Sequence, residues 1–352
     1  MPAEPVFCTA CLSPVENPPE ETFREPVFGR DFGIFRCPHC GVIFSVIPRD
    51  FPLRQWYAKA DHLYGEAAWV VHTPPETDWR FKSFFAAARR LGLRGDLLDL
   101  GSGDGRFLMR ASQEAWPGTL TGLEFNPDMV RRRQGYKVEI APLEEFVERP
   151  GLKPYDVVTI FDVLEHLAEP ARSLRRIVGL IKPGGHLIIT VPNHERIRLF
   201  EREFFDFPPN HNTCWNGSNL ADFVRRQGLN VLEVKVSPFS SRGLSDQLFY
   251  KLFAGALPLV KRLLFGRKAQ SGETLARLLQ EEASSPGGGA NGLKSALADP
   301  VRRRKIELAL SHAFNFAVFP LLLPVYLAVR LFLPRRQGGG LFLVARQDVN
   351  RP

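Results

Sequence analysis

The sequence predicts an α/β protein whose main domain is a doubly wound sheet of seven strands. Three observations support this prediction. Short apolar strand patterns alternate with helical patterns between about residues 77 and 236. A glycine-rich turn follows the first of these strands, and acidic residues follow the ends of later ones. Strands separated by helices imply parallel βαβ units, and such sheets bind ligands at the carboxyl ends of their strands.

The individual elements follow from periodicity and from turn residues. Apolar residues at helical spacing between Phe81 and Leu91 predict a helix before the first strand. Asn126 and Pro127 fit an N-cap and the first position of a later helix. Further helices are expected after Gly105 and over 171–181 and 220–227. Strands are expected at 96–100, 119–123, 138–140, 155–161, 186–191, 229–236 and 341–345.

Composition changes divide the chain into five segments. These are residues 1–47 with two cysteine pairs, a connector at 48–76, the α/β core at 77–236, a basic and apolar helical segment at 237–338, and a last strand and tail at 339–352. The net charge of +8 is unevenly spread. Residues 1–80 carry 7 Lys and Arg against 11 Asp and Glu, whereas residues 240–352 carry 17 against 7. An acidic N-terminal segment disfavours binding to nucleic acid.

The glycine-rich turn has the chemistry of a cofactor site. It begins at Asp99 and runs through Gly101, Ser102 and Gly103. Glycines let a ligand approach the backbone, and the N–H groups at the following helix start attract a carboxylate or phosphate. Glu124, at the end of the next strand, can accept the hydroxyls of a ribose. An acidic residue at the head of the turn repels a pyrophosphate but suits the ammonium group of a methionine, so S-adenosylmethionine is favoured over a dinucleotide.

Three motifs then carry a resemblance to a known family. Residues 97–105 (LLDLGSGDG) resemble the first motif of class I S-adenosylmethionine-dependent methyltransferases. Residues 155–167, with YDVV and DVLEHL, resemble the fourth motif, and 180–189 (LIKPGGHLII) resemble the segment leading into the fifth strand. By these motifs the chain is similar to the well-known ubiquinone-biosynthesis O-methyltransferase group. The resemblance covers about residues 80–236 and implies a Rossmann-like sheet closed by a seventh, antiparallel strand, here 341–345.

The resemblance also implies roles for individual residues. Asp99, Gly101, Ser102 and Gly103 would hold the methionine end of S-adenosylmethionine, and Asp162 would line the same side. Around the nucleoside, the resemblance implies Glu124 at the ribose and Phe125, Pro142, Leu143 and Glu144 beside the adenine.

Two histidines are candidates for the base. Methyl transfer to a hydroxyl needs a group that takes its proton. His166 follows the fourth strand of the core, and His211 lies in the sequence PPNHN before a later helix, in a loop that borders the acceptor site in relatives. Either histidine could instead serve packing or stand on the surface. The residues do not decide whether the methylated atom is oxygen, nitrogen or carbon.

The cysteine pairs predict a zinc ribbon. Cys8 and Cys11 form one Cys-x-x-Cys pair, and Cys37 and Cys40 form the other. Two such turns can bind one Zn²⁺ tetrahedrally, and a site with four cysteine ligands has no open position, so the metal would be structural. The alternative is four unligated thiols. The fifth cysteine, Cys214, is expected to stand apart.

The last third predicts contact with a membrane surface. Residues 244–265 form an apolar helical stripe, and 313–333 are almost wholly apolar but contain two prolines and Arg330. A spanning helix needs about 20 apolar residues, so an interfacial segment on an anionic membrane is preferred. A helical subdomain packed over the active site is the alternative.

The sequence thus predicts a cytoplasmic enzyme, peripheral on the inner membrane face, that uses S-adenosylmethionine and a structural Zn²⁺. Its expected acceptor is a hydroxyl of a small molecule, a saccharide or a lipid-linked compound. Two other functions stay open at this point: a zinc-ribbon RNA methyltransferase, and a non-catalytic membrane-associated scaffold that keeps the methyltransferase fold.

Overall fold

The computed structural model describes residues 6–53, 55–57, 75–130, 135–196, 206–238 and 338–349, together with Pro324 and Leu327. The segments 244–265 and 313–333, for which membrane contact is predicted, lie outside the described residues apart from Pro324 and Leu327. None of the helices within the described ranges is long and apolar enough to cross a bilayer.

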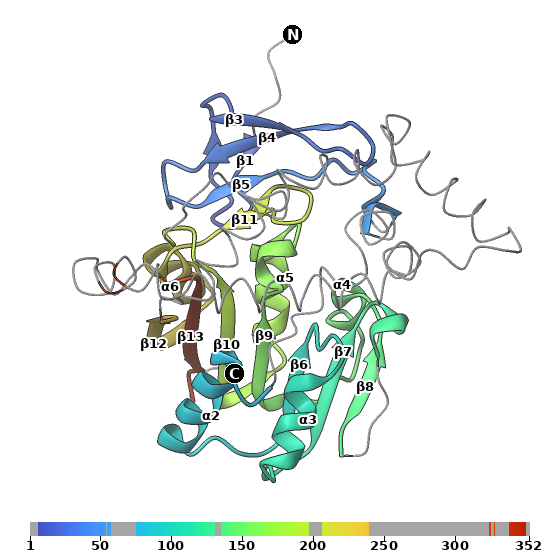
Figure 1. Ribbon diagram of the computed structural model, residues 1–352, viewed down its shortest axis with the longest axis vertical. Coiled ribbons are helices and arrows are strands. Elements are labelled where there is room, and N and C mark those ends of the chain that lie inside the picture. Colours follow the sequence, from blue (N-terminus) through green and yellow to red (C-terminus); the bar gives the residue numbers. More distant parts are fainter. Residues whose placement is uncertain are drawn as a thin grey trace, which may run out of the picture.

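A seven-stranded sheet forms the centre of the molecule (Figure 1). Its strand order is β12-β13-β10-β9-β6-β7-β8, with β13 antiparallel to both neighbours and the strands from β10 to β8 parallel. This is the strand arrangement that the resemblance to methyltransferases implies, including the antiparallel last strand. The strands are β6 (Leu97–Leu100), β7 (Leu120–Glu124), β8 (Lys137–Ile140), β9 (Tyr155–Phe161), β10 (Ile181–Pro192), β12 (Leu229–Val236) and β13 (Gly340–Gln347).

Helices cover both faces of this sheet. On one face, α2 (Trp79–Leu91) and α3 (Arg106–Gln113) pack phenylalanines and alanines against alternate strand residues such as Leu97 and Phe342. On the other face, α4 (Leu143–Phe146), α5 (Pro170–Val178) and α6 (Gly217–Arg226) pack against the residues between, such as Leu98 and Leu343. Strands buried on both faces explain the continuous apolar runs of the sequence.

Two elements differ from their predicted forms. The strand predicted at 186–191 begins at Ile181, and the turn residues before His186 form an irregularity in its pairing with β9. Asn126 does act as a cap, because its side chain accepts a hydrogen bond from the backbone N–H of Asp128, but it starts only the short 3-10 helix η1 (Pro127–Met129). Short 3-10 helices of this kind are common as connectors.

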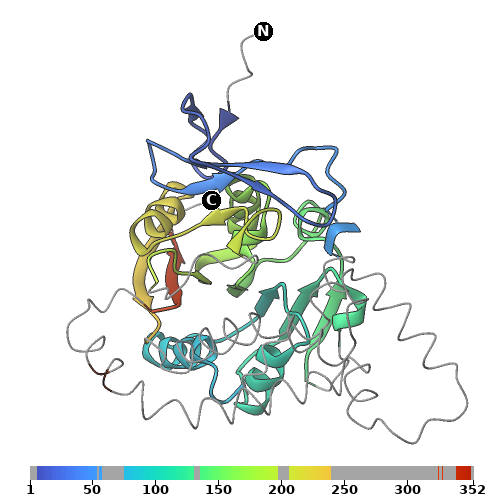
Figure 2. The same cartoon turned by 45° about the horizontal axis from the view of Figure 1, so that its top comes forward.

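The N-terminal segment forms two small sheets above the carboxyl ends of the core strands (Figures 1 and 2). One consists of β1 (Val6–Phe7) and β2 (Pro14–Val15). The other has the order β11-β5-β4-β3. Its members are β3 (Glu21–Arg24), β4 (Asp31–Arg36), β5 (Ile43–Ser45) and, from the core, β11 (Thr213–Cys214).

Candidate cofactor, acceptor and metal sites

The glycine-rich turn after β6 has the backbone that its sequence predicts. Gly101 has φ +75° and Gly103 has φ +55°, both in the left-handed region that glycine occupies at little cost. A Cβ on Gly101 would also overlap the side chain of Val163. The Ser102 side chain faces Gly122 in β7, so Ser102 offers the turn its backbone rather than its hydroxyl. The turn therefore leaves a backbone surface that a ligand can approach.

Glu124 holds this turn from the end of β7. Its carboxylate is buried and accepts hydrogen bonds from the backbone N–H groups of Gly103 (2.8 Å), Phe125 (2.9 Å) and Asn126 (2.9 Å). Burial raises its pKa. An ionised carboxylate has about four acceptor positions, so three bonds leave one for a ribose hydroxyl.

The predicted adenine neighbours lie beside Glu124. The end of β8 pairs with the end of β7, Ile140 opposite Glu124, so Pro142, Leu143 and Glu144 follow directly alongside. Phe125, on the other side of Glu124, is 54% exposed. An exposed aromatic face next to an acidic strand end suits a planar base.

Asp99 is more deeply buried than Glu124 at the predicted cofactor turn. It is 2% exposed and accepts a hydrogen bond of 2.7 Å from the Thr159 hydroxyl. Burial, reinforced by the charge of Glu124, raises the pKa of Asp99 to about 7. A cationic ligand beside it would return the carboxylate to its ionised form.

Asp162, at the end of β9, is tied to a residue that the sequence did not single out. Asp162 has φ +54°, and its carboxylate accepts a hydrogen bond from Thr190 (2.8 Å) and pairs with the Arg80 guanidinium (2.5 Å). Arg80 also pairs with buried Asp78, which caps α2. Arg80 is the second residue of the apolar helix α2 and lies 82 residues from Asp162, so no local pattern marks it. The structure thus adds a guanidinium, the usual partner of a carboxylate, to the side where the sequence predicts the methionine end of the cofactor.

The two predicted histidines lie together. Their ring centroids are 4.9 Å apart, His166 in the 3-10 helix η2 (Leu164–His166) and His211 in the loop before β11. His166 Nδ1 is 2.7 Å from the carbonyl of Asn210, so Nδ1 carries the proton and Nε2 is the accepting nitrogen. Burial, with the neighbouring His211, lowers the pKa of His166 to about 3.

Glu165 completes this group, and the sequence reasoning gave it no role beyond its place in a motif. It is 1% exposed, and neither carboxylate oxygen has a hydrogen-bond partner among the described residues. Burial, and then the charge of Asp162, raises its pKa well above the ordinary range. Glu165 Oε1 is 3.9 Å from His166 Nε2. One potential ligand atom from each of Glu165, His166 and His211 lies within 4.8 Å of the others, which is a donor set suited to a divalent cation.

The four paired cysteines form a second cluster. The Sγ atoms of Cys8 and Cys40 are 3.7 Å apart, and those of Cys11 and Cys37 are 3.5 Å apart. Four thiolates at the Zn–S distance of ~2.3 Å would be ~3.8 Å from one another, so the geometry fits one tetrahedral ion. Cys214 lies in β11 and is not a member.

Comparisons with known proteins agree with this geometry. A family model described as a methyltransferase domain matches residues 79–234. The ubiquinone biosynthesis O-methyltransferase of Salmonella arizonae is 33% identical over 117 residues, which are 31% of this chain and 48% of that protein. The Serratia proteamaculans protein of the same name is 34% identical over 104 residues, 28% of this chain and 42% of its own length. The chain therefore spans about half the length of the curated relatives it matches.

Solved structures are similar at a lower level. The cyclase SpnF has a TM-score of 0.48 at 17% identity, covering 87% of this chain and 99% of its own. An S-adenosylmethionine-dependent methyltransferase from Archaeoglobus fulgidus has a TM-score of 0.38 at 16% identity, covering 76% and 94%. The matching family model, the three sequence motifs and the sheet order together identify residues 79–234 as a class I S-adenosylmethionine-dependent methyltransferase domain.

Proposed function

We propose that this chain transfers a methyl group from S-adenosylmethionine to a hydroxyl of a small-molecule, saccharide or lipid-linked acceptor. The observation that carries the proposal is the group formed by Glu165, His166 and His211 at the carboxyl ends of the core strands. It lies close to Asp162 on the methionine side, where a nucleophile must meet the methyl group. The similarity to O-methyltransferases of ubiquinone biosynthesis supports a hydroxyl acceptor.

The residues around the glycine-rich turn bind and orient S-adenosylmethionine. S-Adenosylmethionine, when bound, supplies a methyl group on a sulfonium centre that a nucleophile can displace. Asp99 would receive the ammonium group, Arg80 the carboxylate, and Glu124 a ribose hydroxyl. Alignment of donor and acceptor provides most of the acceleration in such a displacement, so a rigid turn held by Glu124 is what the reaction requires.

Two uses of the acceptor-side group fit its geometry. His166 Nε2 is an open acceptor and can take the proton of a hydroxyl. Alternatively, Glu165, His166 and His211 hold a divalent cation, which would lower the pKa of a hydroxyl that binds to it. A fully buried carboxylate without a hydrogen bond is costly unless it is protonated or bound to a cation, and this favours the second use.

The test of the proposed function begins with the cofactor. Calorimetric titration with S-adenosylhomocysteine should show micromolar binding that Asp99→Ala and Glu124→Ala both weaken, roughly tenfold or more for loss of a charge-assisted contact. Asp222→Ala, which changes an exposed carboxylate on α6 that pairs with Arg225, is the matched control. Absence of binding by the folded protein would contradict the enzyme function and support a scaffold.

The acceptor is then tested by methyl transfer. Radiolabelled S-adenosylmethionine is supplied with catechols, phenols, saccharides and lipid-linked saccharides, with and without Mg²⁺ or Mn²⁺. We expect an ether product and a dependence on the cation that Glu165→Gln abolishes. Full activity in the presence of a chelator would mean that a histidine takes the proton of the acceptor hydroxyl without help from a cation. Methylation of RNA in place of these acceptors would contradict the proposed substrate class.

A further inference from the structure

The sheet that contains β5 is shared between the cysteine-rich segment and the methyltransferase domain. β11 adds to its edge, with Thr213 opposite Phe44 and Cys214 opposite Ile43. The next residue, Trp215, bridges to Asn193 after β10. The same strand connection therefore touches the cysteine-rich segment on one side and the core sheet on the other (Figures 1 and 2).

One apolar cluster also runs through both parts, although Phe32, Phe51 and Trp56 form a separate cluster. Cys8, Val42 and Phe44 belong to the same buried cluster as Val158 and Trp215 of the core. Phe23 of β3 stacks on Phe207, with ring centroids 4.4 Å apart and planes 13° apart. A tethered module with its own core would not show this continuity, so the cysteine-rich segment is packed as a part of the domain.

Asn212 connects this sheet to the acceptor-side group. It is 1% exposed, and its carbonyl accepts a hydrogen bond of 2.9 Å from the backbone N–H of Ser45. Its own N–H donates to the carbonyl of Glu165 (2.7 Å), and its side-chain amide donates to the carbonyl of His166 (2.8 Å). One residue thus fixes the backbone of η2 and is itself fixed by β5.

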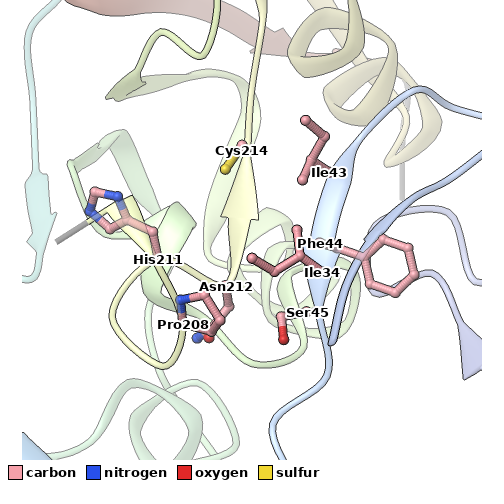
Figure 3. A pocket seen from close by; sticks show the side chains of 8 residues that line it. All are labelled: Ile34, Ile43, Phe44, Ser45, Pro208, His211, Asn212 and Cys214. Carbon is pink, nitrogen blue, oxygen red and sulfur yellow. The ribbon is translucent and has the colours of Figure 1, made fainter. Parts of the chain in front are cut away.

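Little free space separates the two parts here. Figure 3 shows the small cavity between β4, β5 and the segment that leads into β11, where Ser45, Asn212 and Cys214 are among the lining residues. Its volume is about 10 Å³, room for about one water molecule. A displacement of β5 would therefore be passed to the loop instead of being absorbed by a void.

The turn that contains Cys37 and Cys40 leads directly into β5. The N–H of Cys37 donates to the carbonyl of Val42 (3.0 Å), and Gly41 donates back to Cys37 (2.9 Å), which closes the turn that precedes Ile43. A metal ion held by four thiolates would fix this turn, because a structural zinc site supplies much of the folding free energy of a small sheet.

We propose that the metal-loaded cysteine cluster is a positioning element of the acceptor site, and that Asn212 is the positioning residue that transmits it. The cofactor turn is held from elsewhere, by Glu124 and β7. Loss of the metal therefore loosens residues 206–216 and η2 while the cofactor turn keeps its structure.

Amide hydrogen exchange on the full chain tests this. In Cys37→Ser, with zinc loss verified by metal analysis, we expect exchange of residues 206–216 and 164–167 to accelerate about tenfold or more, while residues 97–108 change less than about twofold. Affinity for S-adenosylhomocysteine should stay within about threefold of wild type. Cys214→Ser is the matched control, because it removes the cysteine outside the cluster, and it should keep zinc and protection.

Two results would overturn the proposal. Exchange that rises in residues 8–45 but not in 206–216 would show that the parts are not coupled. Equal acceleration at 97–108 would show a general loss of stability instead of local positioning.

A second variant serves if Cys37→Ser does not fold. Asn212→Ala in the zinc-loaded protein removes the hydrogen bond from the Asn212 side-chain amide to the carbonyl of His166, and it changes no cysteine. We expect the ring resonances of His166, assigned through His166→Gln, to shift, while those of His39 next to Cys40 stay in place. An unmoved His166 signal with zinc bound would refute the role of Asn212.

Discussion

Replacing Glu165 by glutamine should stabilise the metal-free protein at neutral and alkaline pH. The wild-type carboxyl is fully buried and has no hydrogen-bond partner within the part of the chain that the structure describes, and burial raises its pKa. In the unfolded chain its pKa returns to an ordinary value of ~4.3. Between these two pKa values the folded state binds more protons than the unfolded state, so wild-type stability falls as pH rises through this window. Glutamine removes this titration.

The magnitude follows from the same geometry. Each unit by which the folded pKa exceeds the unfolded one costs ~1.4 kcal/mol once the group must ionise. A buried amide that keeps imperfect hydrogen bonds still costs ~1–3 kcal/mol, so only part of the gain is recovered. We expect Glu165→Gln to raise the free energy of unfolding by ~1–3 kcal/mol at pH 8 and by close to nothing at pH 4.

Denaturant unfolding from pH 4 to pH 9 in the presence of a magnesium and manganese chelator measures this difference. Glu169→Gln is the matched control, because Glu169 is exposed and lies four residues further on. Addition of Mn²⁺, which prefers oxygen and imidazole ligands to thiolates, should stabilise wild type but not Glu165→Gln. Destabilisation by Glu165→Gln at pH 8 without a cation would refute the reasoning, because it would mean that the carboxylate has a stabilising partner.

Three further predictions address other parts of the chain. Affinity for S-adenosylhomocysteine should rise about tenfold per pH unit below pH 7 and then level off as Asp99 ionises, and calorimetry of Asp99→Asn should show a flat profile over the same range. Arg80→Lys should weaken the binding of S-adenosylhomocysteine about tenfold, because an ammonium cannot form hydrogen bonds to Asp162 and to a ligand carboxylate in the fork geometry of a guanidinium. A loss of affinity no larger than that of a variant at an exposed arginine would contradict this role. Vesicle flotation should recover the full chain with anionic but not with neutral lipid if 244–265 and 313–333 contact a membrane, and salt should release it.

Much of the fold could be predicted because its determinants are local in the sequence. Apolar runs bounded by turn residues mark β6, β7 and β9 to within about one residue, and the glycine turn has the φ values that its composition indicates. The resemblance to methyltransferases supplied the antiparallel last strand, which no local pattern orients. The cysteine spacing predicted four thiols at one point, and the structure brings them together.

The long-range contacts of the candidate cofactor and acceptor sites needed the tertiary structure. Arg80 reaches Asp162 across 82 residues, and Asn212 joins Ser45 to Glu165 and His166. Arg80, Asn212 and Ser45 are ordinary polar side chains in their own sequence neighbourhoods. The sequence by itself determined the strands, the cofactor turn and the cysteine pairs, because short-range sterics and periodicity encode them. Only the tertiary structure decided which buried polar groups lack a partner and which distant strand completes the small sheet, because burial and pairing arise when remote segments pack.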